Sequence, residues 1–66
     1  MKVGDFVTLR YYRNPDAPVG RIIWTFARHH NVKWSQNYVT SGAHSDNLLA
    51  VNMSDEQKML WILENE

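Results

Sequence analysis

The sequence predicts a mainly β fold in which five short strands form a small barrel and one amphipathic α-helix packs on it at the C-terminal end. Residues 3–12 alternate between two side-chain classes with the period of a half-buried strand, whereas residues 54–65 follow a helical period. A chain of 66 residues supports one domain, which buries only about 60% of the surface of its unfolded chain. We therefore expect a single domain over residues 1–66, with the barrel at 2–52 and the helix at 54–65.

The strands are expected where apolar and β-branched residues lie between turn-forming residues. Val3, Val7, Leu9 and Tyr11 share one parity and are expected to face inward from the first strand. A loop at residues 14–20, marked by two prolines, Asp and Gly, should follow. The later strands are expected at residues 21–28, 32–34, 38–42 and 48–51, with a turn at residues 29–31.

The second strand is apolar on both of its faces. Its alternating sets are Ile22, Trp24 and Phe26 on one face, and Ile23 and Ala27 on the other. A strand of this kind is normally covered on both sides, so one face should line the barrel interior and the other should lie under the helix. Phe6, on the outer face of the first strand, could join that second cluster. A β-bulge that redirects the side chains is the alternative.

The C-terminal segment carries a helix-start sequence. Ser54 is expected to be the N-cap, with Gln57 at the third helical position and two acidic residues in the first turn. At 100° per residue, the apolar side chains of Met59, Leu60, Ile62 and Leu63 form one stripe, which we expect to pack on the barrel. Trp61 falls outside this stripe.

Composition narrows the possible functions. The chain contains no cysteine, which excludes disulfides, thiolate nucleophiles and cysteine-ligated zinc. No apolar run approaches the roughly 20 residues of a membrane span, and the first residues lack a signal-peptide pattern, so we expect no membrane partner and a cytoplasmic location. An apolar content of 44% is typical of a folded chain.

Four short motifs resemble the Src-homology-3-like (SH3-like) barrels of the Tudor and KOW kind. They lie, in order, at residues 3–7 (VGDFV), 20–22 (GRI), 32–34 (VKW) and 47–51 (NLLAV). In particular, the chain is similar to small barrels encoded by tailed bacteriophages. The resemblance covers residues 2–52 and implies a five-stranded SH3-like barrel. Barrels of this kind bind RNA, DNA, proline-rich peptides, methylated side chains or partner proteins, so the resemblance leaves the ligand open.

Histidines are the candidates for a metal site or a general base. His29 and His30 are adjacent, so in a strand they point to opposite faces and cannot readily bind one ion. His44, Ser45 and Asp46 are consecutive, whereas a catalytic triad needs side chains that converge from separate positions. A cap by Asp46 or Ser45 on the turn before Leu48 is the better interpretation. We expect no metal, no cofactor and no enzymatic activity.

Charge is unevenly distributed although the formal net charge is zero. Residues 1–44 contain six basic and two acidic residues, giving +4, and residues 45–66 contain one basic and five acidic residues, giving −4. A basic barrel face interleaved with aromatic residues is one way to bind single-stranded nucleic acid. The residues that would carry this alternative function are Arg10, Arg21, Arg28 and Lys33.

The favoured hypothesis is a non-enzymatic protein–protein interaction module, which by resemblance would be a phage accessory protein that binds and modulates a host protein in the host cytoplasm. Tryptophan is enriched at binding hot spots, and Trp61 lies off the apolar stripe. The alternative for Trp61 is that it covers a loop beside Pro15 or Pro18. A homodimer through the helix and a virion component are further possibilities. The candidate contact residues are Trp61, Tyr12 and Phe6, with Arg10 and Arg13 as supporting charges.

Overall fold

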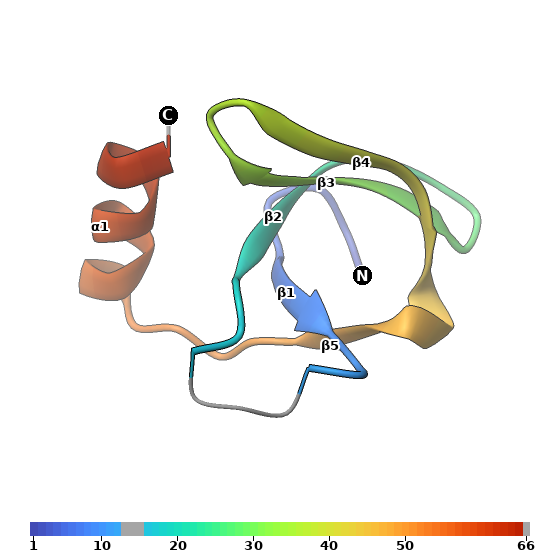
Figure 1. Cartoon of the computed structure of the whole chain (residues 1–66), viewed down its shortest axis with the longest axis horizontal. Coiled ribbons are helices and arrows are strands. Elements are labelled where there is room, and N and C mark those ends of the chain that lie inside the picture. Colours follow the sequence, from blue (N-terminus) through green and yellow to red (C-terminus); the bar gives the residue numbers. More distant parts are fainter. Residues whose placement is uncertain (13–15, 66) are drawn as a thin grey trace.

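The computed structural model describes residues 1–12 and 16–65 and contains one five-stranded antiparallel sheet with a C-terminal helix. The strand order is β4-β3-β2-β1-β5, and Figure 1 shows the sheet curving round, with the helix standing beside it. The predicted mainly β fold class is confirmed. The elements are β1 (Phe6–Leu9), β2 (Gly20–Phe26), β3 (His29–Ser35), β4 (Tyr38–His44), the 3₁₀-helix η1 (Ser45–Asn47), β5 (Leu48–Ala50) and α1 (Asp55–Asn65).

The core lies inside the curved sheet and takes one fully buried aliphatic side chain from each of four strands. These are Val7, Ile22, Val32 and Leu48. Trp34 packs against this cluster and donates a hydrogen bond from Nε1 to Thr40 Oγ1 at 2.8 Å. Gly20 leaves the room that this packing needs, because a Cβ there would lie 2.5 Å from Val32 Cγ1 and 2.7 Å from the Trp34 ring. Val3 and Tyr11, predicted to face inward, are instead exposed outside β1.

A β-bulge divides β2 into two parts with different orientations. Ile22 pairs with one β3 residue and Trp24 pairs with the adjacent β3 residue, so Ile23 is the extra residue. As a result, Ile22 is buried, whereas Trp24 and Phe26 are exposed on the outer side of the sheet. The prediction that these three side chains share one inward face is wrong. The bulge, proposed as the alternative, is the correct explanation.

The β2–β3 hairpin turns two residues earlier than predicted. Phe26 pairs with His29, which leaves Ala27 and Arg28 as a two-residue turn, so the turn predicted at residues 29–31 is wrong. Ala27 has a φ of 54°, the left-handed conformation that tight hairpins need. Such turns usually contain Gly, Asn or Asp, and Ala27 and Arg28 are none of these, so the sequence does not indicate a turn here.

No described helix is long and apolar enough to cross a membrane.

The start of α1 forms as predicted. Ser54 Oγ accepts a hydrogen bond from Gln57 N at 3.2 Å, and Gln57 Oε1 accepts one from Ser54 N at 2.9 Å. These two reciprocal bonds form a capping box, which satisfies backbone donors that the first turn leaves free. The capping box therefore fixes where α1 begins, directly after the segment that follows β5.

The face of α1 that docks on the sheet is not the predicted one. Trp61 is only 8% exposed, its ring contacts Phe6 edge-on at 5.3 Å, and its Nε1 donates to the carbonyl of Val19 at 2.8 Å. Met59, Leu60 and Leu63 are exposed, so the prediction that their stripe packs on the barrel is wrong. One indole supplies a large apolar area and also the N–H that pairs the Val19 carbonyl, which a leucine cannot do. Phe6 is buried under α1, but against Trp61. Ile23 and Ala27, which were expected to share that place under the apolar stripe, are exposed.

Candidate protein-binding surface

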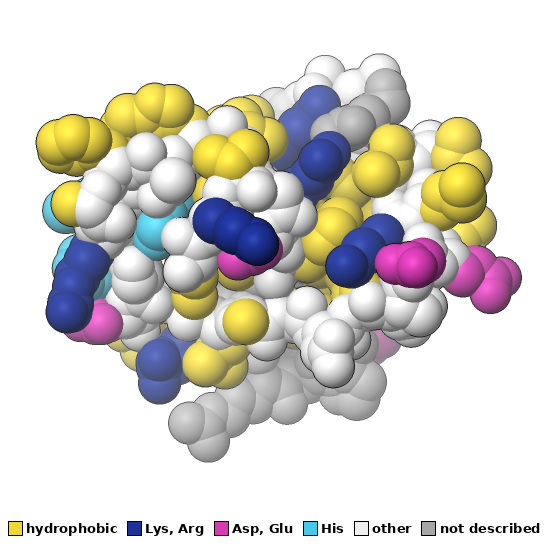
Figure 2. Space-filling view, turned by 180° about the vertical axis from the view of Figure 1, so that it is seen from behind, with side chains coloured by type: hydrophobic (Ala, Val, Ile, Leu, Met, Phe, Trp, Pro, Cys, Tyr) yellow, Lys and Arg dark blue, Asp and Glu magenta, His cyan; other side chains and the backbone are white. Residues whose placement is uncertain are grey.

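Four ring side chains, three of them exposed and that of His44 half-buried, form a patch on the outer side of the sheet, which we call the aromatic face. It consists of Trp24 and Phe26 on β2, His29 on β3 and His44 on β4. The Trp24 and Phe26 rings stack with centroids 6.2 Å apart, and the His29 and His44 rings meet edge-on at 5.2 Å. Strand register continues the row, because Phe26 pairs with His29 and His29 pairs with His44. Figure 2 shows hydrophobic side chains gathered beside histidines at this end of the molecule.

Exposure distinguishes this patch from the core rings. Trp24 is 48% exposed and Phe26 is 71% exposed, although both belong to the ordered β2–β3 hairpin. Exposed apolar patches on small proteins commonly mark interaction sites. Because the rings extend from paired strands, their positions are set by the sheet before any partner arrives.

The inner side of the same hairpin is held by a buried polar chain centred on His30. Its Nδ1 lies 2.7 Å from Thr25 Oγ1 and its Nε2 lies 2.8 Å from Ser45 Oγ, and Ser45 Oγ in turn donates to the Arg28 carbonyl at 3.1 Å. Since the Ser45 hydroxyl donates to that carbonyl, it accepts from His30 Nε2–H, and Nδ1 accepts from the Thr25 hydroxyl. Each side-chain polar atom of this hydrogen-bond network has a partner, and the network links β2, β3 and η1.

The protonation state of His30 follows from its burial. The side chain is 1% exposed, and this desolvation, followed by nearby positive groups, lowers the pKa of His30 below that of a free histidine. A neutral imidazole with both nitrogens engaged holds the hairpin and has no access to a substrate. The Ser45 hydroxyl is committed to a backbone carbonyl. The pair therefore stabilises the surface above it and does not resemble an activated nucleophile.

The triplet at residues 44–46 forms a cap. His44 Nδ1 accepts a hydrogen bond from Asp46 N at 3.1 Å and lies 3.6 Å from Asp46 Oδ2, which makes His44 the N-cap of η1. A cap at this turn was expected, but with Asp46 or Ser45 as the capping residue, and the structure gives that role to His44. Within residues 1–12 and 16–65, no group of three or more His, Cys, Asp or Glu side chains is placed to hold a metal ion.

The predicted contact residues do not form one surface. Trp61 and Phe6 are buried against each other, so neither is an exposed contact residue. The bond from Trp61 to the Val19 carbonyl agrees with the alternative that Trp61 covers the loop near Pro18. Tyr12 is exposed beyond β1, and Arg10 is exposed with its Nε donating to the Asp46 carbonyl. Arg13 lies outside the described residues. Of this set, Arg10 is the residue that the structure connects with the elements of the aromatic face, through η1.

The predicted basic residues also separate. Arg21 on β2 lies opposite Lys33 in the register of β3 and opposite Phe6 in the register of β1. Both basic residues are therefore on the part of the sheet where Phe6 packs against Trp61 of α1. Arg28 lies at the hairpin turn, beyond Phe26, and five strand positions of about 3.3 Å each place that end about 16 Å away. Arg28 and Arg10 both flank η1, through the Arg28 carbonyl and the Arg10 side chain. The four residues thus form two pairs and not one continuous basic face.

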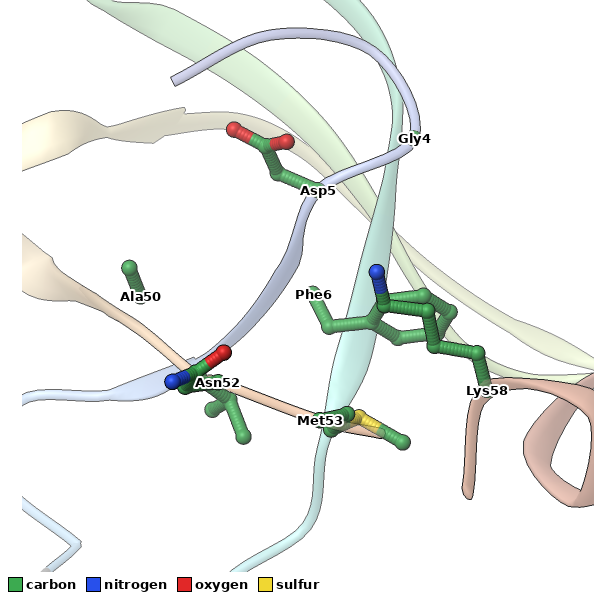
Figure 3. Close-up of a pocket in the computed structure, with 8 residues that line it drawn as sticks. Gly4, Asp5, Phe6, Ala50, Asn52, Met53 and Lys58 are labelled. Carbon is green, nitrogen blue, oxygen red and sulfur yellow. The ribbon is translucent and has the colours of Figure 1, made fainter. Parts of the chain in front are cut away.

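A shallow pocket of about 360 Å³ lies between β1, the segment after β5 and the start of α1. Asp5, Phe6, Asn52, Met53 and Lys58 are among the residues that line it. Figure 3 shows the Lys58 side chain lying over Phe6, with the Asp5 carboxylate directed away from it. Asp5 Oδ2 accepts a hydrogen bond from the Lys2 backbone N–H at 3.0 Å. This arrangement presents no converging acid and base, so we attach no chemistry to the pocket.

The aromatic face is the feature that sequence reasoning missed. Its signal was present in the unusual apolar content of both faces of residues 22–27, which we interpreted mainly as burial on two sides. A bulge produces the same pattern, because one inserted residue moves every later side chain to the opposite face.

Comparisons with known proteins do not assign the chain to a family. No family model matches it, no curated protein matches it significantly and no solved structure matches it significantly. We therefore infer its function from the fold and from the aromatic face.

Proposed function

We propose that the protein is a non-enzymatic protein–protein interaction module that binds its partner through the aromatic face. The observation that carries this proposal is the stacked, exposed pair of Trp24 and Phe26 on an ordered hairpin. Aromatic side chains that are already ordered lose little conformational entropy on binding, and tryptophan is enriched among residues that dominate binding energy.

The charges around the aromatic face favour a partner with acidic as well as apolar side chains. Arg28 is exposed at the hairpin turn and Arg10 is exposed beside η1, while Asp46 is the acidic residue in η1. Complementary charges of this kind orient the encounter more than they strengthen the complex. By resemblance to phage-encoded barrels, the setting we propose is a phage accessory protein acting on a host protein in the host cytoplasm.

Nucleic-acid binding is the second candidate function. Rings beside an arginine can also stack on unpaired bases, and the aromatic face with Arg28 offers both. The separation of the basic residues into two pairs argues against it, because phosphate binding is strongest on a continuous basic surface.

An affinity pull-down from bacterial lysate, with and without nuclease, tests the proposal. We expect one protein to be captured in near-stoichiometric amount, to survive nuclease and to be lost with Phe26→Ser. The matched control is Val3→Ser, which removes an exposed apolar side chain outside the aromatic face and should leave capture unchanged. Capture that disappears with nuclease, together with salt-sensitive oligonucleotide binding, would favour the second function instead.

A further inference from the structure

Helix α1 carries a second exposed apolar surface, which we call the outer stripe. At 100° per residue, the direction opposite the docked Trp61 passes between Met59 and Leu63, with Leu60 at its margin. All three are exposed, and Leu63 is 77% exposed. Nothing within the described chain covers this stripe.

The outer stripe is acidic at its N-terminal end. The same geometry places Asp55 and Glu56 on the outward half of the first turn, whereas Glu64, about 60° from Trp61, lies on the half of the helix that faces the barrel. Lys58, the single basic residue of the helix, lines the pocket on the side of the barrel. The outer stripe therefore combines apolar side chains with negative charge, which is the partner chemistry proposed above for the aromatic face.

The two surfaces lie at opposite ends of the molecule. In Figure 1 the helix is at the left, and the β2–β3 hairpin that carries the aromatic face extends to the far right. The longest dimension of the chain is 29 Å. Because Trp61 fixes α1 at its own end, a chain cannot cover its aromatic face with its own helix, but a second copy can.

We infer that the outer stripe of one copy docks on the aromatic face of another, so that the protein associates head to tail with itself. This inference rests on the proposed function and names a second copy as one partner of the aromatic face. Apolar side chains would be buried on both sides, and Arg28 and Arg10 would meet the carboxylates of the helix. A contact between two different surfaces need not close, so the assembly should grow with concentration.

Charge favours this arrangement over a symmetric dimer. A dimer that paired two outer stripes would bring two sets of acidic side chains together, and one that paired two aromatic faces would bring two copies of Arg28 together. Head-to-tail contact is the combination of these surfaces that places unlike charges opposite each other.

A complementation experiment tests the inference directly. Phe26→Ser removes the more exposed of the two stacked rings of the aromatic face, and Leu63→Ser removes the most exposed side chain of the outer stripe. Both side chains are exposed, so neither change disturbs the core. Sedimentation velocity should show that the average mass of the native chain rises with concentration above the 7.8 kDa of one copy. Each variant alone should remain monomeric, whereas a 1:1 mixture should form a species of two copies and no larger. Val3→Ser should behave like the native chain.

Other outcomes overturn the inference. A native chain that stays monomeric at about 1 mM would overturn the inference, because a contact with a dissociation constant of about 1 mM or lower would form detectable complex at that concentration. If Leu63→Ser abolished association and Phe26→Ser did not, the contact would be a symmetric pair of helices. If the 1:1 mixture of the two variants did not associate, the two surfaces would not be complementary. Failure here leaves the proposed function distinguishable, because Phe26-dependent capture of a different protein in the pull-down does not require self-association.

Discussion

The attachment of α1 through Trp61 can be tested by removing that one side chain. The helix has 11 residues, a length that is marginal for an isolated helix in water. Truncating a buried tryptophan to alanine typically costs about 3–5 kcal/mol. A 66-residue chain has a total stability of about 3–10 kcal/mol, so Trp61→Ala should remove a large part of it. The change deletes both the Phe6 ring contact and the bond to the Val19 carbonyl.

Urea denaturation followed by circular dichroism provides the assay, at a protein dilution where the chain is monomeric. We expect Trp61→Ala to lose about 3 kcal/mol or more and to show reduced helical signal before the sheet unfolds. Trp61→Phe keeps a ring but leaves the Val19 carbonyl unpaired, which should cost about 1–3 kcal/mol. Leu63→Ala, on the exposed stripe, should stay within about 0.5 kcal/mol of the native chain. If Leu63→Ala cost as much as Trp61→Ala, the observed docking face would be incorrect.

Three further predictions concern the sheet and the helix cap. Gly20→Ala should destabilise the fold by about 1–3 kcal/mol in the same urea assay, because the new Cβ would meet Val32 and Trp34; a neutral result would contradict that packing. Ser54→Ala should cost about 1 kcal/mol by removing the capping box, whereas Ser54→Asp should largely retain the stability. Stability should decrease as the pH falls below about 6.5, because the pKa of His30 is lowered in the folded state and the unfolded chain takes up the proton first. His30 is neutral in both the folded and the unfolded state above that pH, so it causes no loss of stability there. In His30→Gln the urea midpoint should therefore fall less between pH 7 and 5 than in the native chain. Equal slopes in the two proteins would refute the role of His30.

Elements with strong local signals could be predicted from the sequence. The capping box at Ser54 and Gln57 depends on neighbouring residues alone, and it appears as expected. The number of strands followed from alternation and from turn residues. The general fold class did not depend on placing each boundary correctly.

Orientation could not be predicted in the same way. The bulge at Ile23 depends on pairing between β2 and β3, so the sequence offered it only as an alternative to burial on both faces. The turn at Ala27 lacks the glycine or asparagine that would reveal it. One extra residue exposes Trp24 and Phe26, so the candidate surface itself follows from tertiary pairing.

The helix shows a related limit. A hydrophobic stripe predicts the docked face only when several side chains share the contact. Here a single indole and one accepting carbonyl outweigh three exposed aliphatic side chains. The candidate contact residues chosen from the sequence therefore include two, Trp61 and Phe6, that hold the fold together.

Site-specific photo-crosslinking tests the central claim most directly, which is that the aromatic face binds protein. Benzoylphenylalanine would replace Phe26 in one sample and Val3 in a control sample, and each would be irradiated in bacterial lysate. We predict that position 26 yields protein adducts, identified by mass spectrometry as another protein or a second copy, and that position 3 yields few. Equal adducts at both positions, or adducts at position 26 with nucleic acid alone, would contradict the claim.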